Sequence, residues 1–366
     1  MGVCTYMKHE FFVHGRTELA GNHTDHQRGR TLSAAVDLGL RATAEPNGSG
    51  LIRVRSRGFD SFEVSIRQLS VRTGEFGRSV GMVRGVAAAF DELGLNIGGF
   101  DAEITSDLPA GAGLGSSAAF SVLIGNILSV LYNGGAIDPI VIARAGHKAE
   151  NQFFGKPTGL SCQLGCAMGG TIYADFKTGQ VERIENDFAA MGLTLCLTDT
   201  GGSHAGLETS YARIPADMVY IANLFDKGVL GDVDPADFRG KGWDASNRPV
   251  RRAMHFFNEN ERVPLMRDAL KAGDGAEYMR LMNLCGRSSE RMLNNVFTSA
   301  TGDTKLEQGL EKSAALLDGR GAWRVQGGGF AGCVQALMPV GFFPEYKREM
   351  EKVFGEGSCM EVHLKK

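Results

Sequence analysis

The chain has 366 residues, of which 50 are glycine and only 10 are proline. Apolar residues make up 43% of the chain and charged residues 22%, which excludes a collagen-like or a disordered chain. No run of about 18 or more consecutive apolar residues occurs, so we expect no membrane-spanning helix. The formal net charge of −3 gives no basic footprint for nucleic acid or for an anionic membrane. Small molecules are therefore the expected partners.

The length of the chain exceeds the roughly 250–300 residues at which a single core stops growing, so we expect two lobes with a ligand site in the cleft between them. The chain begins without the apolar stretch of a signal peptide. The 7 cysteines form no CxxC pair and mostly lie in apolar runs, as buried cytosolic thiols do. They stand at positions 4, 162, 166, 196, 285, 333 and 359. We therefore predict a cytoplasmic protein.

In the first half, strands alternate with helices. Alternating apolar and polar residues predict an antiparallel hairpin over 52–55 and 62–66 and a strand over 100–104. Apolar residues at helical spacing predict helices over 80–93, 116–131 and 139–154. Strand character over 171–184 then ends near Asp187, where we place a lobe boundary.

The second half begins with a strand over 193–197, followed by helices near 204–224, 249–271, 275–293 and 304–318. It ends with strands over 322–326 and 333–337, a helix over 344–353 and a strand over 359–364. Strands grouped in hairpins with helices between them favour an α+β fold over a doubly wound parallel sheet.

Three alternate glycines, Gly111, Gly113 and Gly115, directly precede the helix expected over 116–131. A helix N-terminus presents unpaired N–H groups, and glycine lets the backbone close on an anion, so phosphate is the natural ligand. No lysine follows as in a Walker A loop, and the preceding strand looks antiparallel, unlike that of a Rossmann fingerprint. A turn that only permits close packing is the alternative.

A second glycine-rich segment, over 327–332, lies between two expected strands. A simple hairpin needs one or two glycines, so this composition indicates backbone that another group approaches closely. A longer hairpin is the alternative.

A dense polar run over 15–29 follows the apolar residues 11–13. Crowded carboxylate, amide and imidazole groups can hydrogen-bond the hydroxyls of a polyol, and Arg16 can face a phosphoryl group. A metal site at His23, Asp25 and His26 is a weaker interpretation because the spacing is not HExxH. A solvated polar loop is the third interpretation of this segment.

Together and in this order, the three segments resemble the GHMP small-molecule kinases and, within them, the galactokinase family. Residues 15–29 resemble the signature GRxNLIGEHTDYxxG, residues 109–118 the phosphate loop PxxxGL(G/S)SSA, and residues 324–333 the motif (K/R)xTGGGFGGC. Residues 149–155 match a helix end AENxFxG, and Tyr211 stands where the family has a sugar-contacting tyrosine. The resemblance extends from about Phe11 to Val362.

The resemblance implies a two-lobed α+β GHMP kinase fold with mixed and antiparallel sheets, an N-terminal lobe over 1–187, a C-terminal lobe over 188–366 and the active site in the cleft. It implies transfer of the γ-phosphoryl group of ATP to the anomeric hydroxyl of galactose. Residues expected to wrap the ATP phosphates are Gly111, Ala112, Gly113, Leu114, Gly115, Ser116 and Ser117, with Gly327, Gly328 and Gly329 approaching the sugar and the phosphates.

The resemblance also assigns roles to single side chains. Ser117 and Glu150 would hold Mg²⁺, a hard ion suited to oxygen ligands. Arg16 would steady the nucleophile and the charge on the transferred phosphoryl group. The sugar would be held by Asn22, His23, Asp25 and Tyr211.

The chain departs from the family at the catalytic carboxylate. Where galactokinases read GxPCGIMDQ after the glycine, this chain places Cys162 at the aspartate. A general base contributes roughly 10²–10⁴ in rate, whereas phosphoryl transfer depends mostly on positioning and charge neutralisation. A thiolate favoured by Arg16 and an inert small thiol are the two interpretations of Cys162. Asn22 also replaces a usual glutamate, and His26 a usual tyrosine.

Two further functions stay open at this point. Cys162 beside intact phosphate-binding segments is compatible with a sensor or regulator that binds galactose and ATP without turnover. A GHMP kinase of another small molecule is the second alternative, against which the intact His23-Thr24-Asp25 and Tyr211 argue.

Overall fold

The computed structural model describes residues 7–109, 111–203 and 205–365. Cys4, Ala110 and His204, which belong to segments singled out above, lie outside the described residues. The chain forms two compact units. Unit 1 holds the chain up to Arg16, Ala35–Leu108 and Gly115–Gly169, and unit 2 holds Thr17–Ala34, Pro109–Leu114 and the chain from Gly170 onward. The lobe boundary near Asp187 coincides with none of these changes and stays a prediction.

The sheet of unit 1 is mixed. The strands β3 (Leu51–Ser56) and β4 (Phe62–Ser65) form the expected antiparallel hairpin, with Leu51 opposite Ser65. The strand β5 (Phe100–Ser106) pairs with β3 in parallel and with the C-terminal part of β2 (Arg30–Pro46) antiparallel. The long strand β1 (His9–Ala20) also pairs with β2.

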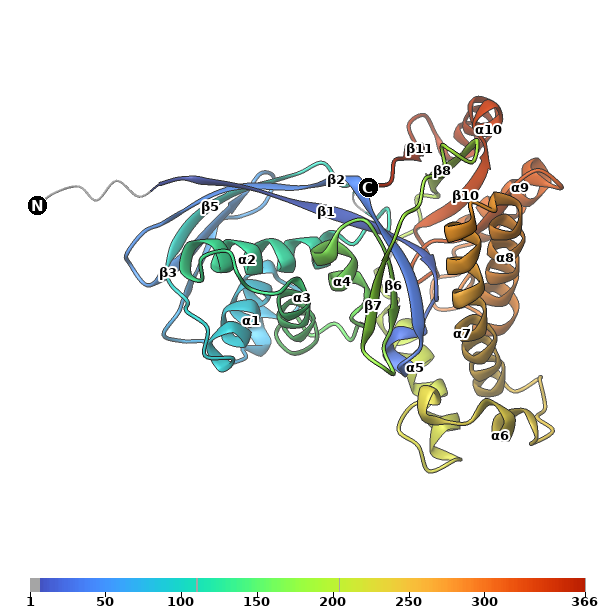
Figure 1. Cartoon of the computed structure of the whole chain (residues 1–366), viewed down its shortest axis with the longest axis horizontal. Coiled ribbons are helices and arrows are strands. Elements are labelled where there is room, and N and C mark those ends of the chain that lie inside the picture. The colour runs from blue at the N-terminus through green and yellow to red at the C-terminus, as the bar shows by residue number, and fades with distance from the viewer. Residues whose placement is uncertain (1–6, 110, 204, 366) are drawn as a thin grey trace, which may run out of the picture. The chain divides into compact units, whose positions relative to one another are not determined.

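Helices α1 (Ser79–Glu92), α2 (Ser116–Tyr132) and α3 (Pro139–Lys148) pack together in unit 1 and lie beside its strands (Figure 1). The predicted helix over 139–154 ends as a π-helical turn, Ala149–Phe153, and a short helix α4 (Ser161–Met168) follows. The core side chains of α2, such as Leu123 and Ile127, are fully buried. A helix buried this deeply fixes its own N-terminus, which begins after the N-cap Gly115.

Unit 2 contains a four-stranded antiparallel sheet in the order β11 (Cys359–Val362), β8 (Leu193–Asp199), β10 (Cys333–Pro339), β9 (Ala322–Val325). The residues of β2 that belong to this unit pair with β6 (Thr171–Asp175), which pairs with β7 (Gln180–Ile184). All of these strands except β2 were expected from the sequence.

The helices of unit 2 are α5 (Glu208–Asn223), α6 (Pro235–Arg239), α7 (Arg248–Ala272), α8 (Gly275–Ser288), α9 (Lys305–Leu317) and α10 (Phe343–Phe354). The helices α7 and α8 lie side by side (Figure 1). The helix α8 also contacts β9. A second π-helical turn, Ser289–Leu293, ends α8. The architecture confirms the α+β fold predicted above.

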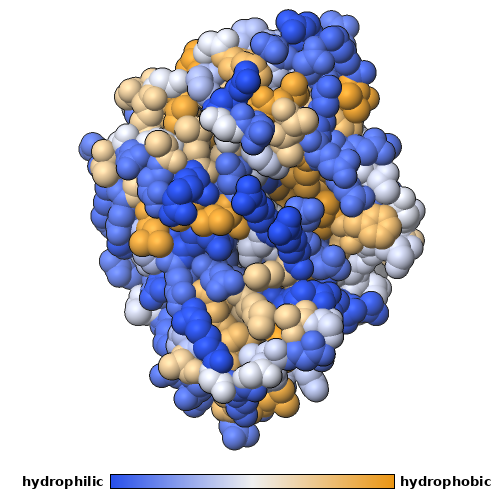
Figure 2. Space-filling model, turned by 90° about the vertical axis from the view of Figure 1, so that its right-hand side faces the viewer, coloured by the Kyte–Doolittle hydropathy of each residue, from blue (hydrophilic) through white to orange (hydrophobic). Residues whose placement is uncertain are grey.

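Hydrophilic residues cover most of the face seen in Figure 2, and its apolar residues lie in small separate groups. Within the described ranges, no helix is both long enough and apolar enough to span a bilayer.

Candidate functional site

The polar run over 15–29, which begins on the last part of β1, is not a solvated loop. Thr17, Asn22 and Thr24 are buried, and the Thr24 hydroxyl donates to the carbonyls of Gly21 at 2.9 Å and Arg30 at 2.6 Å. These bonds close a compact turn that contains a 3₁₀ turn, Asp25–Gln27, before β2 begins. The turn therefore presents its side chains in a fixed arrangement.

The carboxamide of Asn22 connects three segments of unit 2. Its Nδ2 donates to Glu18 Oε1 at 3.0 Å and to the Gly327 carbonyl at 2.7 Å, and its Oδ1 accepts from Asn295 Nδ2 at 3.0 Å. Glu18 in turn pairs with the buried Arg324. Both N–H donors of Asn22 are thus in use, and only Oδ1 has a lone pair left for a further donor.

Side chains hold all three carbonyls of the glycine segment 327–329. Asn22 holds that of Gly327, and Asn295 Nδ2 and His23 Nε2 donate to that of Gly328 at 3.1 and 3.2 Å. The Tyr211 hydroxyl donates to the Gly329 carbonyl at 2.6 Å. Three of the four residues expected to hold a sugar therefore converge on this segment, together with Asn295.

Only glycine fits at position 329. Its φ of +81° is a conformation that L side chains rarely adopt, and a Cβ atom there would lie 2.0 Å from the carbonyl oxygen of Asn295. Backbone approached this closely is what the composition of 327–332 indicated, although here the approaching group is the protein itself.

The imidazoles near the turn are kept neutral by burial. His23 Nδ1 lies 3.2 Å from His26 Nε2, and burial, followed by the charge of His23, lowers the pKa of His26 to about 4. Burial also lowers the pKa of His23 and of His255, whose Nε2 donates to the Asn22 carbonyl at 2.9 Å. At neutral pH these groups therefore act as hydrogen-bonding partners without charge.

The first part of the phosphate loop contacts Gln326, the residue before the glycine segment, in unit 2. Gly111 and Gly113 both have left-handed backbone, with φ of +77° and +68°. Gln326 Nε2 donates to the Gly113 carbonyl at 3.1 Å and to Thr17 Oγ1 at 3.1 Å. The loop and the sugar-signature strand are thus joined through one side chain.

The second part of the loop lies in unit 1 at the start of α2. Gly115 is the N-cap of α2, with a φ of +75°. Ser117 Oγ donates to Glu150 Oε1 at 2.9 Å, Gln163 Nε2 donates to Glu150 Oε2, and Lys156 Nζ lies 3.8 Å from Oε1. Glu150 stands in the π-helical turn, an element often found at functional sites, and is 3% exposed. The structure therefore brings the two predicted Mg²⁺ ligands into contact.

Arg16 and Cys162 are also neighbours in unit 1. Arg16 Nη2 donates to Cys162 Sγ at 2.6 Å, and Cys162 lies in the first turn of α4. A guanidinium group and a helix N-terminus both favour the thiolate form of a cysteine. Burial instead raises the pKa of Cys166, which lies one turn further along the same helix.

The family of GHMP kinases N terminal domains matches residues 81–170, and the galactokinase galactose-binding signature matches residues 6–46. The first match contains the phosphate loop and Cys162, and the second contains Arg16 and the turn with Asn22. Residues 81–170 are therefore similar to the N-terminal domain of the GHMP kinases, and residues 6–46 to the galactose-binding segment of the galactokinases.

Two curated relatives of this chain are the galactokinases of Streptococcus mutans and Staphylococcus carnosus. Each is 28% identical, over 94% of this chain and 89% or 88% of the relative. The crystal structure of Lactococcus lactis galactokinase complexed with galactose superposes with a TM-score of 0.86 at 22% identity, covering 98% of this chain and 93% of the other. The crystal structure of Methanococcus jannaschii mevalonate kinase superposes with a TM-score of 0.67 at 16% identity, covering 99% of each chain. These likenesses confirm the GHMP kinase fold.

Several residues that contact the predicted site were not singled out from the sequence. Asn295 follows the second π-helical turn and has no motif around it, so no local signal marks it. Gln163 stands directly after Cys162 and matches the final glutamine of the motif GxPCGIMDQ. This match could have identified Gln163 as a site residue. Gln326 belongs to the third motif, where its amide group was not considered.

Proposed function

We propose that this chain is a GHMP kinase that phosphorylates galactose at its anomeric hydroxyl, with ATP as donor, giving galactose 1-phosphate and ADP. The match of residues 6–46 to the galactose-binding signature carries the proposal. The galactokinases among its relatives, matched over nearly their whole length, support it. The free thiols at all six described cysteines support a cytoplasmic location.

In this proposal the ATP phosphates bind the backbone of 111–117 and the N-terminus of α2. The left-handed glycines turn the loop, and the helix contributes unpaired N–H groups and the positive end of its dipole. Ser117 and Glu150 would hold Mg²⁺. They fit this ion because they offer a hydroxyl and a buried carboxylate oxygen, and Mg²⁺ usually takes one or two carboxylates together with phosphate oxygens and water. When bound, the ion would neutralise phosphate charge.

The sugar would bind at the turn 21–29 and at Tyr211. Asp25 would offer carboxylate oxygens to sugar hydroxyls, and His23 would contact the sugar by exchanging its hydrogen bond to Gly328 or His26 for one to a hydroxyl. Tyr211 offers its phenolic oxygen as an acceptor because the hydroxyl hydrogen goes to Gly329. Asn22 can accept one sugar hydroxyl at Oδ1 while its Nδ2 holds the glycine segment. A carboxylate at this position could not donate a hydrogen bond to the Gly327 carbonyl. This explains why an asparagine suits position 22, where the family usually has a glutamate.

Arg16 and Cys162 would act on the transferred group. The anomeric oxygen forms a bond to the γ-phosphorus, the bond from that phosphorus to the oxygen of ADP breaks, and the hydroxyl proton passes to the Cys162 thiolate. Arg16, which donates to Sγ, stabilises the thiolate and the charge on the phosphoryl group.

The test is ADP release by the full chain with ATP and Mg²⁺, with and without galactose. We expect galactose to stimulate release more than other hexoses and more than mevalonate. Stimulation by another small molecule alone would instead identify a GHMP kinase of that substrate.

The thiol in place of the expected aspartate favours one second candidate, a sensor that binds galactose and ATP without turnover. Titration calorimetry separates the two, because the sensor binds both ligands with no ADP release. If neither galactose nor ATP binds, both the kinase function and the sensor function are contradicted.

A further inference from the structure

A cavity of about 230 Å³ in unit 2 is lined by α5, α7 and the residues after the second π-helical turn. Three arginines face it: Arg213 from α5, and Arg248 and Arg252 from α7. No residue of the phosphate loop lines it, and neither do His23, Asp25 or Tyr211. The cavity is therefore distinct from the site proposed above.

One carboxylate accompanies the three guanidinium groups. Asp217 accepts from Arg248 Nε at 2.7 Å and from Arg252 Nη1 at 2.8 Å, and both its oxygens are engaged. Burial, together with the charges of Arg248 and Arg213, lowers the pKa of Arg252, although Asp217 opposes this. Arg252 is buried and Arg248 half-buried, whereas Arg213 is exposed at the rim of the cavity. Three guanidinium groups and one carboxylate leave an excess of positive charge that would attract an anion.

Donors in the cluster remain available. The Arg213 guanidinium group makes no hydrogen bond or ion pair to any described residue. Arg252 uses Nε for the Leu293 carbonyl and Nη1 for Asp217 and the Arg213 carbonyl, which leaves Nη2 unused within the described chain. Hydroxyl groups of Ser210 and Thr298, 3.1 Å apart, also line the cavity. Guanidinium and hydroxyl groups are the usual donors to phosphate oxygens.

The size of the cavity limits its ligand. Its volume lies below the roughly 300–1,000 Å³ of sites for drug-sized ligands. Phe330, which follows the glycine segment and has an unusual φ of +59°, forms one wall, and Tyr211 packs edge-on against it. We propose that this three-arginine cavity is a second anion site, which binds inorganic phosphate or the phosphate group of a small phosphate monoester.

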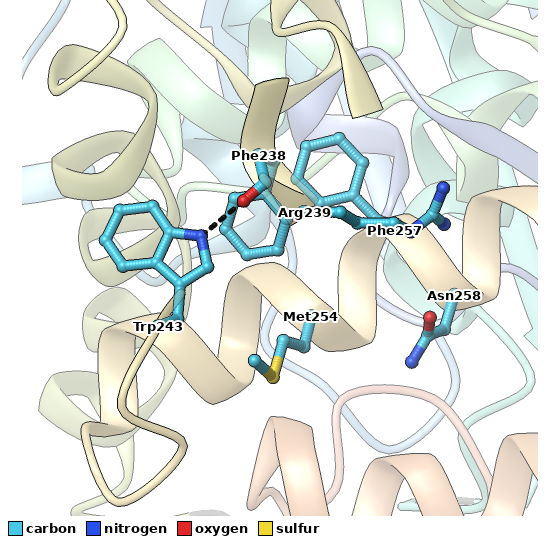
Figure 3. A pocket seen from close by; sticks show the side chains of 6 residues that line it. All are labelled: Phe238, Arg239, Trp243, Met254, Phe257 and Asn258. Atoms are coloured by element: carbon cyan, nitrogen blue, oxygen red, sulfur yellow. Dashed lines mark hydrogen bonds between the residues drawn. The ribbon is translucent and has the colours of Figure 1, made fainter. Parts of the chain in front are cut away.

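A second cavity of similar size lacks the excess positive charge of the three-arginine cavity. It measures about 260 Å³ and is lined by the aromatic rings of Phe238, Trp243 and Phe257 (Figure 3). The Trp243 indole N–H donates to the Phe238 carbonyl at 2.6 Å. Its one arginine, Arg239, pairs with Glu261 at 2.7 Å. A single neutralised arginine gives no excess charge, so Arg239 provides a matched control.

The test is titration calorimetry on the full chain, saturated with Mg²⁺ and a non-hydrolysable ATP analogue so that the phosphate loop is filled. Inorganic phosphate and galactose 1-phosphate are the two probes, and binding of one or both to the wild type is expected, weaker at higher salt. Binding of the ester alone would identify a monoester as the ligand, and binding of both would identify the phosphate group itself.

The variants locate the binding. Arg213→Gln loses no ion pair, so its fold should persist, and it should weaken phosphate binding about tenfold because a charge-assisted hydrogen bond is lost. Arg239→Gln should bind as the wild type does. The proposal is overturned if neither probe binds the wild type, or if Arg213→Gln binds with wild-type affinity. Neither result depends on turnover, so failure here is distinguishable from failure of the proposed kinase activity.

Discussion

Replacing Cys162 with aspartate should raise the turnover number of the proposed reaction. Cys162 is half-buried at the start of α4, and its sulfur accepts a hydrogen bond from Arg16 Nη2 at 2.6 Å. An aspartate side chain is of similar size and would receive the same donor as a charge-assisted bond, so the helix and the arginine should keep their places.

The expected gain follows from the fraction of molecules with an ionised base. An aspartate is almost fully ionised at neutral pH, whereas an ordinary cysteine is about a few per cent thiolate. If Arg16 and the helix N-terminus raise the thiolate fraction only in part, aspartate should increase kcat by about tenfold, within the roughly 10²–10⁴ that a positioned base supplies in total. Cys162→Ala removes the base and should lower kcat by about 10².

The assay is steady-state ADP release with saturating ATP, Mg²⁺ and galactose, compared among the wild type, Cys162→Asp and Cys162→Ala. Cys166→Ala is the control, because Cys166 lies on the same helix as a buried thiol whose pKa is raised by burial. Equal kcat in the wild type and in both Cys162 variants would refute the idea that position 162 carries a base.

Three further predictions concern the ion, the glycine segment and the histidines. Glu150→Gln keeps the size of the side chain but removes its charge, so Mg²⁺ should strengthen ATP binding less than in the wild type, as measured by calorimetry with and without the ion. Gly329→Ala should lower the unfolding free energy by more than about 1 kcal/mol, because its Cβ would meet the Asn295 carbonyl at 2.0 Å. Gly357→Ala, with a φ of +79° and open space around it, should lower the melting temperature less. Between pH 6.5 and about 4 the unfolded chain protonates His26 while the folded chain does not, so stability should fall by up to about 3 kcal/mol as pH drops through this window. His26→Asn should flatten that part of a chemical-denaturation pH profile, and an unchanged profile would show that His26 is not the group responsible.

The elements with a clear local period could be predicted from the sequence. The hairpin of β3 and β4, the apolar helix α2 and the strands on both sides of the glycine segment all lie within a few residues of their expected places. Periodicity reports burial on one face, and these elements are buried in that simple way.

Strands β1 and β2 were not expected over the full lengths that the structure shows. Thr17 and Arg16 are polar, yet they lie buried on β1, where each forms a hydrogen bond to a partner distant in sequence. Gln326 and Cys162 are 309 and 146 residues away from these two side chains. Alternation of apolar and polar residues cannot report such burial, since it depends on partners that only the fold brings together.

Some contacts within the candidate site could likewise be predicted from the sequence, and others could not. The motifs predicted that Ser117 and Glu150 share one ion, and the structure brings these two side chains into hydrogen-bond contact, while their role as ion ligands stays a prediction. The motifs alone could not reveal that Asn22, His23 and Tyr211 hold the carbonyls of the glycine segment, since this depends on the path of a loop. Asn295 was missed for the same reason.

The glycine segment has a consequence for how two ligands influence each other. Its carbonyls are bound by the sugar-signature turn, and Gln326, the residue before it, binds the Gly113 carbonyl of the phosphate loop. A ligand that shifts one of these partners changes the free energy of placing the other. Linkage then requires reciprocity: the factor by which galactose strengthens ATP binding must equal the factor by which ATP strengthens galactose binding. The order in which the two substrates bind would then affect the rates of assembly of the complex but not its final stability.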